Sequence, residues 1–266
     1  MPKTLPDLRK MKQDGQKIVG IVVYDYQTAQ IADRAGADVI SLGDSVGHNI
    51  LGQRGQEEVT LDQVVMFARA VRGGVKDALF NCDMPFGSYQ TGEEEAVRSA
   101  IRMVKEGGVD CVKIEVTRPQ ANIVAAIARA GIPVFAQFGL TPTTSAQLGG
   151  WDSGAKLPVE DMVETAKILE QAGASMLDVT HAGEATGPVT RAVSIPVLCG
   201  VGNDGNSDGQ IRTLFRMAGQ AAASVDDEYP RYGSVAREYF ETITAYAADI
   251  RAGKLPNGYP SGRRPS

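Results

Sequence analysis

Short apolar runs alternate with longer amphipathic stretches from Lys17 almost to the end of this chain, and this alternation constrains its fold more than any other feature. Each run is short and rich in Val, Ile and Leu, as expected of a strand that is buried on both faces. Seven runs predict strands, at Ile18–Tyr24, Asp38–Leu42, Ala78–Cys82, Cys111–Val116, Pro133–Phe138, Met176–Thr180 and Pro196–Val201. A weaker eighth candidate is Gln220–Ser224.

Helical patterns fill the intervals between these runs. They predict helices at Gln27–Ala35, Leu61–Arg72, Glu93–Glu106, Gln120–Ala130 and Val159–Ala172. Several of them stop at a glycine just before the next run, in the phrases RAGADV, KEGGVD, ARAGIPV and EQAGASM. Glycine there provides the left-handed cap that ends a helix. Repeated strand-then-helix order predicts a parallel sheet with right-handed crossovers.

The length of 266 residues fits one large α/β domain. Eight strands with interleaved helices favour a (β/α)8 TIM barrel, which commonly takes about 250 residues. A doubly wound open sheet is the alternative. We expect one barrel domain over residues 1–266 with a C-terminal helical extension. From Ser234 the chain reads as one long amphipathic helix, expected on the outside of the barrel or on a neighbouring subunit.

Charge and cysteine content exclude several classes of protein. The net charge of −5 disfavours a nucleic-acid or anionic-membrane binder, because such proteins present a basic face. Three cysteines are too few and too dispersed for a disulfide framework or a four-cysteine zinc site. The chain contains no long apolar run that could span a membrane, and its polar start lacks a signal-peptide core. We expect a cytoplasmic protein.

Charged side chains follow three successive predicted strands where each strand ends. Asp44 and Ser45 follow the second strand, Asp83 follows the third, and Lys113 and Glu115 close the fourth on one face. In α/β barrels the chemistry lies at this end of the strands. Carboxylates gathered there would repel one another unless a cation lies between them, and oxygen ligands suit Mg²⁺. Alternatively, these acids cap helices or pair with Lys113.

A set of motifs along the chain then resembles one family. VVYDYQTAQIAD, GDSVG, DMPFGSYQT, VKIE, FGLTPT and the C-terminal YPRYGSVAREYFETITAYAADIRAGKLPNGYPS occur in the order and spacing of ketopantoate hydroxymethyltransferase. The resemblance covers most of the chain. It implies a barrel of the phosphoenolpyruvate mutase/isocitrate lyase type, a bound Mg²⁺, a 2-oxo acid substrate and a homo-oligomer, commonly a decamer.

The resemblance also implies roles for individual residues. Asp44 and Asp83 match magnesium ligands, and Glu115 matches the third acid near the metal. Ser45 and Lys113, with Asp83, match the residues around the 2-oxo acid. The implied chemistry is removal of a proton next to the carbonyl, followed by attack of the enolate on a one-carbon unit from 5,10-methylenetetrahydrofolate.

Three features depart from the family pattern: Thr180, Gln137 and the glycine-rich segment CGVGNDGNSDGQ after the seventh predicted strand, which is one residue longer than the family form. Thr180 stands where the family has its base, a glutamate in a phrase like LVLE, and a threonine hydroxyl cannot act as a general base near pH 7. Asp178 and His181, on either side of Thr180, are the candidate replacements, and His181 could instead cap the loop or bind substrate. Gln137, a predicted substrate-binding residue, replaces a family histidine and cannot titrate.

These departures leave more than one function open. The chain could be a hydroxymethyltransferase that uses another base, or a divergent aldolase or lyase that acts on another 2-oxo acid. It could also be a barrel that binds the metal and the 2-oxo acid without turnover. The retained charges argue against the last, because converging so many charges without a use is costly.

Overall fold

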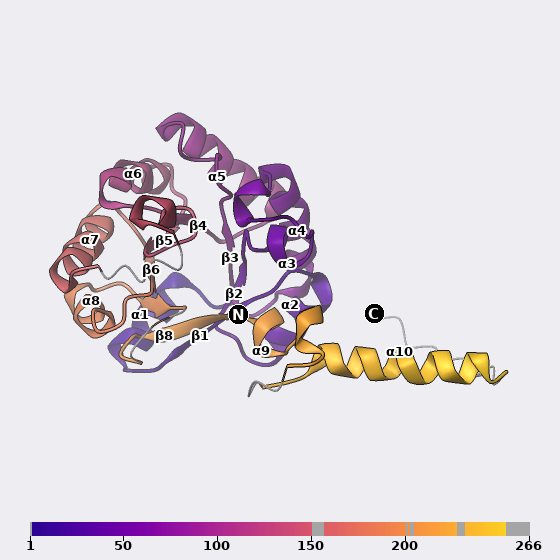
Figure 1. Ribbon diagram of the computed structural model, residues 1–266. Coiled ribbons are helices and arrows are strands. Elements are labelled where there is room, and N and C mark those ends of the chain that lie inside the picture. The colour runs from indigo at the N-terminus through magenta and orange to yellow at the C-terminus, as the bar shows by residue number, and fades with distance from the viewer. Residues whose placement is uncertain (1, 151–156, 201, 203–204, 228–231, 254–266) are drawn as a thin grey trace. The chain divides into compact units, whose positions relative to one another are not determined.

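The computed structural model describes residues 2–150, 157–200, 202, 205–227 and 232–253. Eight parallel strands close into a barrel in sequence order, with helices around them (Figure 1). The strands are β1 (Ile18–Val22), β2 (Val39–Leu42), β3 (Leu79–Asp83), β4 (Cys111–Glu115), β5 (Val134–Gly139), β6 (Met176–Thr180), β7 (Val197–Cys199) and β8 (Gly209–Thr213). The predicted (β/α)8 barrel is confirmed.

The helices follow the predicted pattern closely. They are α1 (Leu5–Gln13), α2 (Tyr26–Arg34), α3 (Val46–Asn49), α4 (Leu61–Gly74), α5 (Glu93–Gly107), α6 (Ala121–Arg129), α7 (Val159–Gln171), α8 (Thr186–Ala192), α9 (Leu214–Met217) and α10 (Val235–Arg251). Short 3-10 turns lie at Gln56–Glu58, Arg118–Gln120, Ser145–Leu148 and Ala222–Ser224. Each of the five helices predicted between strands is present, with ends shifted by one or two residues.

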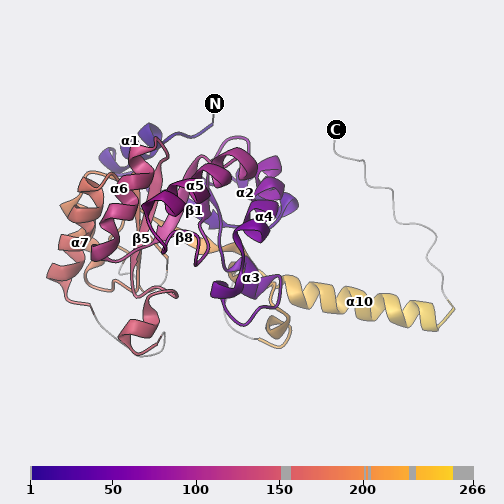
Figure 2. The same ribbon diagram turned by 90° about the horizontal axis from the view of Figure 1, so that it is seen from above.

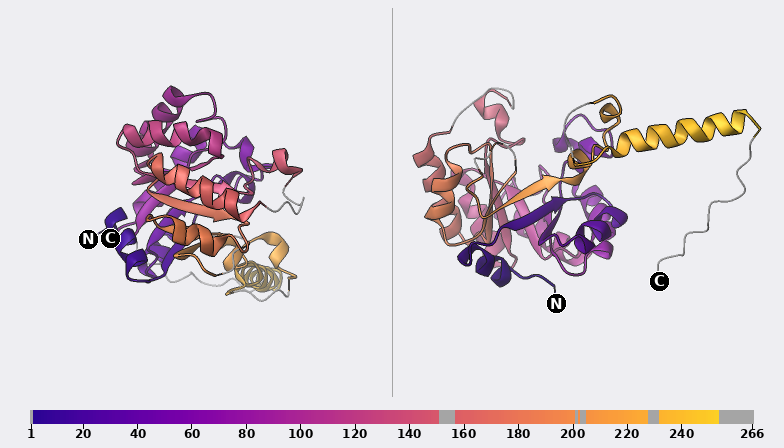
Figure 3. Two further views of the ribbon diagram at one scale, coloured as in Figure 1. Left: turned by 90° about the vertical axis from the view of Figure 1, so that its left-hand side faces the viewer. Right: turned by 90° about the horizontal axis from the view of Figure 1, so that it is seen from below.

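The barrel closes where β8 pairs with β1, in register from Ile18 opposite Gly209 to Val22 opposite Thr213. The two strands lie side by side in the right-hand view of Figure 3. Their backbones approach so closely that a Cβ at Gly209 would lie 2.1 Å from the carbonyl oxygen of Ile18. A glycine is therefore required at this seam.

The prediction of the eighth strand was wrong. Gln220–Ser224 is not a strand, and three of its residues form the 3-10 turn at Ala222–Ser224. The true strand has the sequence GQIRT, in which Gln210 is exposed and Ile211 is the one large buried apolar side chain. Because only one face of β8 is apolar, it has none of the continuous apolar character that marked the other strands.

The amino ends of the strands hold an apolar cluster. It contains one residue from each strand and Leu8 of α1: Leu8, Ile18, Val39, Leu79, Cys111, Phe135, Met176, Leu198 and Ile211. Helix α1 covers this end of the barrel, and α3 lies at the opposite end (Figure 2). Polar side chains are thus left to the carboxyl ends of the strands, where a site can form.

The chain divides into two compact units, Met1–Thr213 and Leu214–Ser266. The first contains the whole barrel. In the second, α10 is the long C-terminal helix that the sequence predicts, and the backbone N–H of Val235, at the start of α10, donates to the carbonyl of Ala218. Across the described part of the chain, no helix is both long and apolar enough to cross a membrane.

Candidate active site

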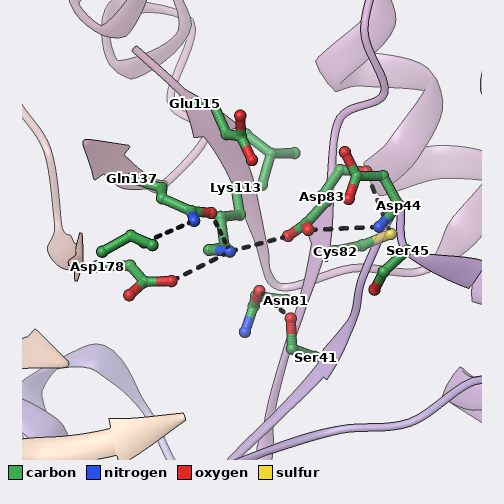
Figure 4. A network of polar contacts seen from close by, with 12 residues as sticks. Ser41, Asp44, Ser45, Asn81, Cys82, Asp83, Lys113, Glu115, Gln137 and Asp178 are labelled. Atoms are coloured by element: carbon green, nitrogen blue, oxygen red, sulfur yellow. Dashed lines mark hydrogen bonds and ion pairs between the residues drawn. The ribbon is translucent and has the colours of Figure 1, made fainter. Parts of the chain in front are cut away.

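The predicted site residues lie at the carboxyl end of the barrel, on strands β2 to β6 and just beyond them. In Figure 4, Asp83, Gln137 and Asp178 point toward the Lys113 ammonium. Asp44 and Ser45 follow β2, Asp83 ends β3, Lys113 and Glu115 belong to β4, Gln137 to β5, and Asp178 and Thr180 to β6, with His181 next in the chain. The barrel therefore brings residues from five strands to one mouth.

Asp44 and Asp83 are adjacent acids at this mouth. The backbone N–H of Asp44 donates to Oδ2 of Asp83 at 3.3 Å. Burial raises the pKa of the Asp44 carboxyl well above its usual range, and the nearby charges of Asp83 and Glu115 raise it further. Because the negative charge of Asp83 disfavours ionisation of Asp44, a cation beside the two acids would be stabilised.

Glu115 lies at the same mouth but is tied to the loop after β5. Its Oε2 accepts hydrogen bonds from the backbone N–H of Thr143, at 2.9 Å, and from the Thr143 hydroxyl. The Tyr89 hydroxyl bridges the backbone of Glu115, donating to its carbonyl and accepting from its N–H. Burial raises the pKa of Glu115, while the bonds from Thr143 oppose that shift.

Lys113 is the cation among these acids. Its Nζ lies 3.2 Å from Oδ2 of Asp178 and 3.4 Å from Oδ1 of Asp83, and it donates to Oε1 of Gln137 (Figure 4). Burial alone would lower the pKa of Lys113, but the surrounding carboxylates, Asp83 and Asp178 foremost, raise it above its ordinary value. Lys113 therefore stays a cation at neutral pH.

Gln137, Asp178 and Thr180 form one connected group with Lys113. Gln137 accepts from Lys113 and donates through Nε2 to the hydroxyl of Thr180 at 2.9 Å. Asp178 opposes the same ammonium. Burial raises the pKa of the Asp178 carboxyl, and the charge of Lys113 opposes that shift. Thr180 is buried and serves here as a hydrogen-bond acceptor.

His181 differs from Asp178 and Thr180 because it is exposed. Its φ of 54° is the one positive value at a non-glycine residue in the part of the chain that the structure describes. A Cβ at Gly202 would lie 3.0 Å from the His181 Cα and 3.2 Å from its Nδ1, so His181 packs against a bare glycine backbone. The N–H of Gly183 donates to the carbonyl of Gly202 at 2.7 Å and joins the two loops. Strained backbone of this kind persists where its surroundings hold it and is frequent at functional sites.

Two residues that the sequence reasoning missed hold Ser45. The hydroxyls of Tyr24 and Ser45 are 2.9 Å apart, and Nδ2 of Asn49 donates to the Tyr24 oxygen at 2.7 Å. Burial raises the pKa of Tyr24, so its phenol stays protonated. Tyr24 follows β1, so the strand-end rule that identified Asp44 and Asp83 could have identified it as well. Asn49 and Thr143 carried no such signal, because Asn49 ends the short helix α3 and Thr143 lies in a turn after β5.

The donors fit a magnesium ion in part. The charge of Asp83 acts on the Asp44 carboxyl, the backbone N–H of Asp44 donates to Oδ2 of Asp83, and Oδ1 of Asp83 is buried with no hydrogen-bond partner. Oxygen donors of this type suit Mg²⁺, which typically takes one or two protein carboxylates and keeps several waters. Within the described ranges, no three His, Cys, Asp or Glu side chains are grouped so as to hold a metal together. The geometry thus fits two carboxylate ligands, with Glu115 held by Thr143.

Comparison with known proteins gives the family. The profile described as "Ketopantoate hydroxymethyltransferase" matches residues 2–258. A relative from Desulfotalea psychrophila, named 3-methyl-2-oxobutanoate hydroxymethyltransferase, is 38% identical over 264 residues, covering 96% of this chain and 92% of its own length. One of the same name from Alkaliphilus metalliredigens is 36% identical over 257 residues, covering 96% of this chain and 90% of its own length.

Solved structures agree on the fold. A 2,3-dimethylmalate lyase, described as a PEP mutase/isocitrate lyase superfamily member, aligns with a TM-score of 0.62 at 17% identity, over 98% of this chain and 92% of its own. An oxaloacetate acetylhydrolase with bound oxalate aligns with a TM-score of 0.62 at 15% identity, over 98% of this chain and 91% of its own. The chain therefore shares the barrel fold of these structures. By sequence, the chain belongs to the ketopantoate hydroxymethyltransferase family of enzymes.

Proposed function

We propose that this protein is a magnesium-dependent hydroxymethyltransferase that acts on 3-methyl-2-oxobutanoate. The observation that carries the proposal is the convergence of Asp44, Asp83 and Lys113 at the carboxyl end of the barrel, in a chain of this family. Adjacent acids beside a buried ammonium can hold a divalent cation together with an anionic substrate.

Asp44 and Asp83 would hold the Mg²⁺ ion, with Glu115 oriented beside them by Thr143. When bound, the ion supplies positive charge that polarises the 2-oxo acid and favours loss of its C3 proton. The buried position of Asp44 keeps water from weakening these electrostatic interactions.

Lys113 and Ser45 would bind the substrate. Lys113 offers a permanent positive charge, and Ser45 a hydroxyl whose position is fixed through Tyr24 and Asn49. Together they orient the carboxylate and keto oxygen, so that the C3–H bond faces a base. Such orientation reduces the barrier by removing the entropy cost of aligning the groups.

His181 is the residue that we assign as the base. Thr180 accepts a hydrogen bond from Gln137, and its hydroxyl does not titrate near neutral pH. Asp178 is buried beneath Lys113 and paired with it. His181 is exposed at the end of the same strand, and an imidazole is suited to proton transfer near neutral pH.

The reaction balances as follows. The C3 proton passes to the base, and the C3 electron pair forms a bond to the methylene carbon of 5,10-methylenetetrahydrofolate. Water supplies the hydroxyl oxygen, and both C–N bonds of the methylene carbon break. The two folate nitrogens take up the proton removed from C3 and one proton from water, tetrahydrofolate leaves, and the 2-oxo acid gains one CH₂O unit.

The test is mass spectrometry of the product formed from 3-methyl-2-oxobutanoate and 5,10-methylenetetrahydrofolate, with Mg²⁺ or with a chelator. We expect the CH₂O adduct with Mg²⁺ and its loss with the chelator, and D44N should behave like the chelated enzyme. No adduct under any condition would contradict the proposal. Cleavage of a hydroxy acid by the same preparation would instead support a divergent lyase.

A further inference from the structure

Asp178 is a buried acid that the proposed chemistry does not use. Its side chain is 4% exposed and faces the Lys113 ammonium, which is itself 9% exposed. Lys113 pairs with two acids: its Nζ lies 3.4 Å from Oδ1 of Asp83 and 3.2 Å from Oδ2 of Asp178. A buried charge that serves no purpose is costly, so this arrangement calls for a role.

Several carboxylates surround Lys113. Asp44, Asp83, Glu115 and Asp178 all interact with this one lysine. Lys113 forms one ion pair with Asp83 and another with Asp178. If Asp178 were neutral, Asp83 would be the nearest remaining acid, and the ammonium would be drawn toward it. A lysine that fully occupies Asp83 competes with any cation for the same carboxylate.

We propose that Asp178 is a positioning residue that holds the Lys113 ammonium back from Asp83, so that Asp83 remains free to bind a divalent cation. Asp178 acts through Lys113 and touches neither the cation nor the substrate. Gln137 supports this position of Lys113 by accepting from the same Nζ, and Thr180 fixes the orientation of Gln137. The inference rests on the proposed function, since it concerns the same metal site.

The experiment is a titration of the full-length protein with Mg²⁺ by isothermal calorimetry, without substrate. D178N keeps the shape of the side chain and removes its charge, and D178S removes the charge with a smaller side chain. The matched control is D33N, which alters another buried carboxylate, one that accepts from the backbone N–H groups of Lys76, Asp77 and Ala78. Melting temperatures of all variants show that each is folded.

We expect both Asp178 variants to bind Mg²⁺ at least about tenfold more weakly than the wild type, as is typical when a group behind a metal ligand is removed. D33N should keep the wild-type affinity whatever its melting temperature. An affinity within twofold of the wild type in both Asp178 variants would overturn the inference, and so would an equal loss in D33N.

Failure of the proposed function has a different signature. A wild type that binds Mg²⁺ but forms no CH₂O adduct contradicts the hydroxymethyl transfer, while the comparison of D178N with the wild type still decides the role of Asp178. A wild type that binds no Mg²⁺ overturns the inference together with the metal site.

Discussion

Several polar side chains at the mouth of this barrel have partners that fix their positions. Tyr24 and Asn49 hold Ser45, Thr143 holds Glu115, and Gln137 links Lys113 to Thr180. Catalysis of this type depends on groups that are oriented before the substrate arrives. The role of a residue can therefore be tested by removing one hydroxyl or one charge.

H181N tests the assignment of the base. General-base catalysis typically contributes a factor of about 100 to 10,000, so we expect product formation to fall by at least about 100-fold. Asparagine tolerates a positive φ, so the free energy of unfolding should stay within about 1 kcal/mol of the wild type. E184Q is the control: it changes another exposed side chain of the loop after β6 and should cost far less activity. Equal losses in the two variants would remove His181 from this role.

Y24F tests the support of Ser45. The variant removes the Tyr24 hydroxyl, which contacts both Asn49 Nδ2 and the Ser45 hydroxyl. Loss of this partner should cost about 1–3 kcal/mol in stability. We expect KM for the 2-oxo acid to rise several-fold and kcat to change less, measured by steady-state kinetics. Y26F removes a phenol on α2 that contacts Gln30 and should leave KM unchanged. An unchanged KM in Y24F would show that Ser45 needs no such support.

At the scale of elements, the periodicity of the sequence predicted most strands and helices, because buried parallel strands read as continuous apolar runs. It failed at β8, whose single apolar face gives no such run. The order of strands also predicted which acids share the mouth. The contacts of Thr143 in its turn and of Asn49 at the end of the four-residue helix α3 could not be predicted, because such short segments have no sequence period.

Helix α1 closes the amino end of the barrel, and its first turn is acid-sensitive. Thr4 and Asp7 form a capping box, and the side-chain and backbone hydrogen bonds from Thr4 hold the pKa of Asp7 below its usual value. A lowered pKa in the folded state stabilises the protein above the pKa of the unfolded chain, and the effect is lost as the pH falls through the lower, folded value.

D7N should therefore be less stable than the wild type at pH 7, and the difference should shrink as the pH falls below about 4. Urea unfolding of both proteins at several pH values measures it. A difference that stays constant over this range would show that the charge of Asp7 does not contribute.

At the scale of the whole barrel, the two ends differ in the side chains that they hold. The amino end holds the apolar cluster under Leu8, and the carboxyl end holds the charged residues. The structure also depends on closure between β8 and β1, the one pairing that joins the last strand to the first. This seam has no room for a side chain at Gly209.

G209A should thus destabilise the barrel by about 1–3 kcal/mol or more, because its Cβ would collide with the backbone of Ile18. G200A, after β7, is the control: its Cβ would meet no described atom closer than the carbonyl oxygen of Ile211, at 3.7 Å. Chemical denaturation of both variants measures the difference. Similar stabilities would mean that β8 can move away from β1 without cost.

We expect the acids and Lys113 at the mouth to promote loss of the C3 proton of a 2-oxo acid. The most direct measurement is nuclear magnetic resonance of 3-methyl-2-oxobutanoate incubated with the enzyme and Mg²⁺ in D₂O. The account predicts that the C3 proton is replaced by deuterium without any one-carbon donor, and that D44N and a chelator each abolish the exchange. If the wild type with Mg²⁺ leaves the C3 proton in place, with or without 5,10-methylenetetrahydrofolate, the account is wrong.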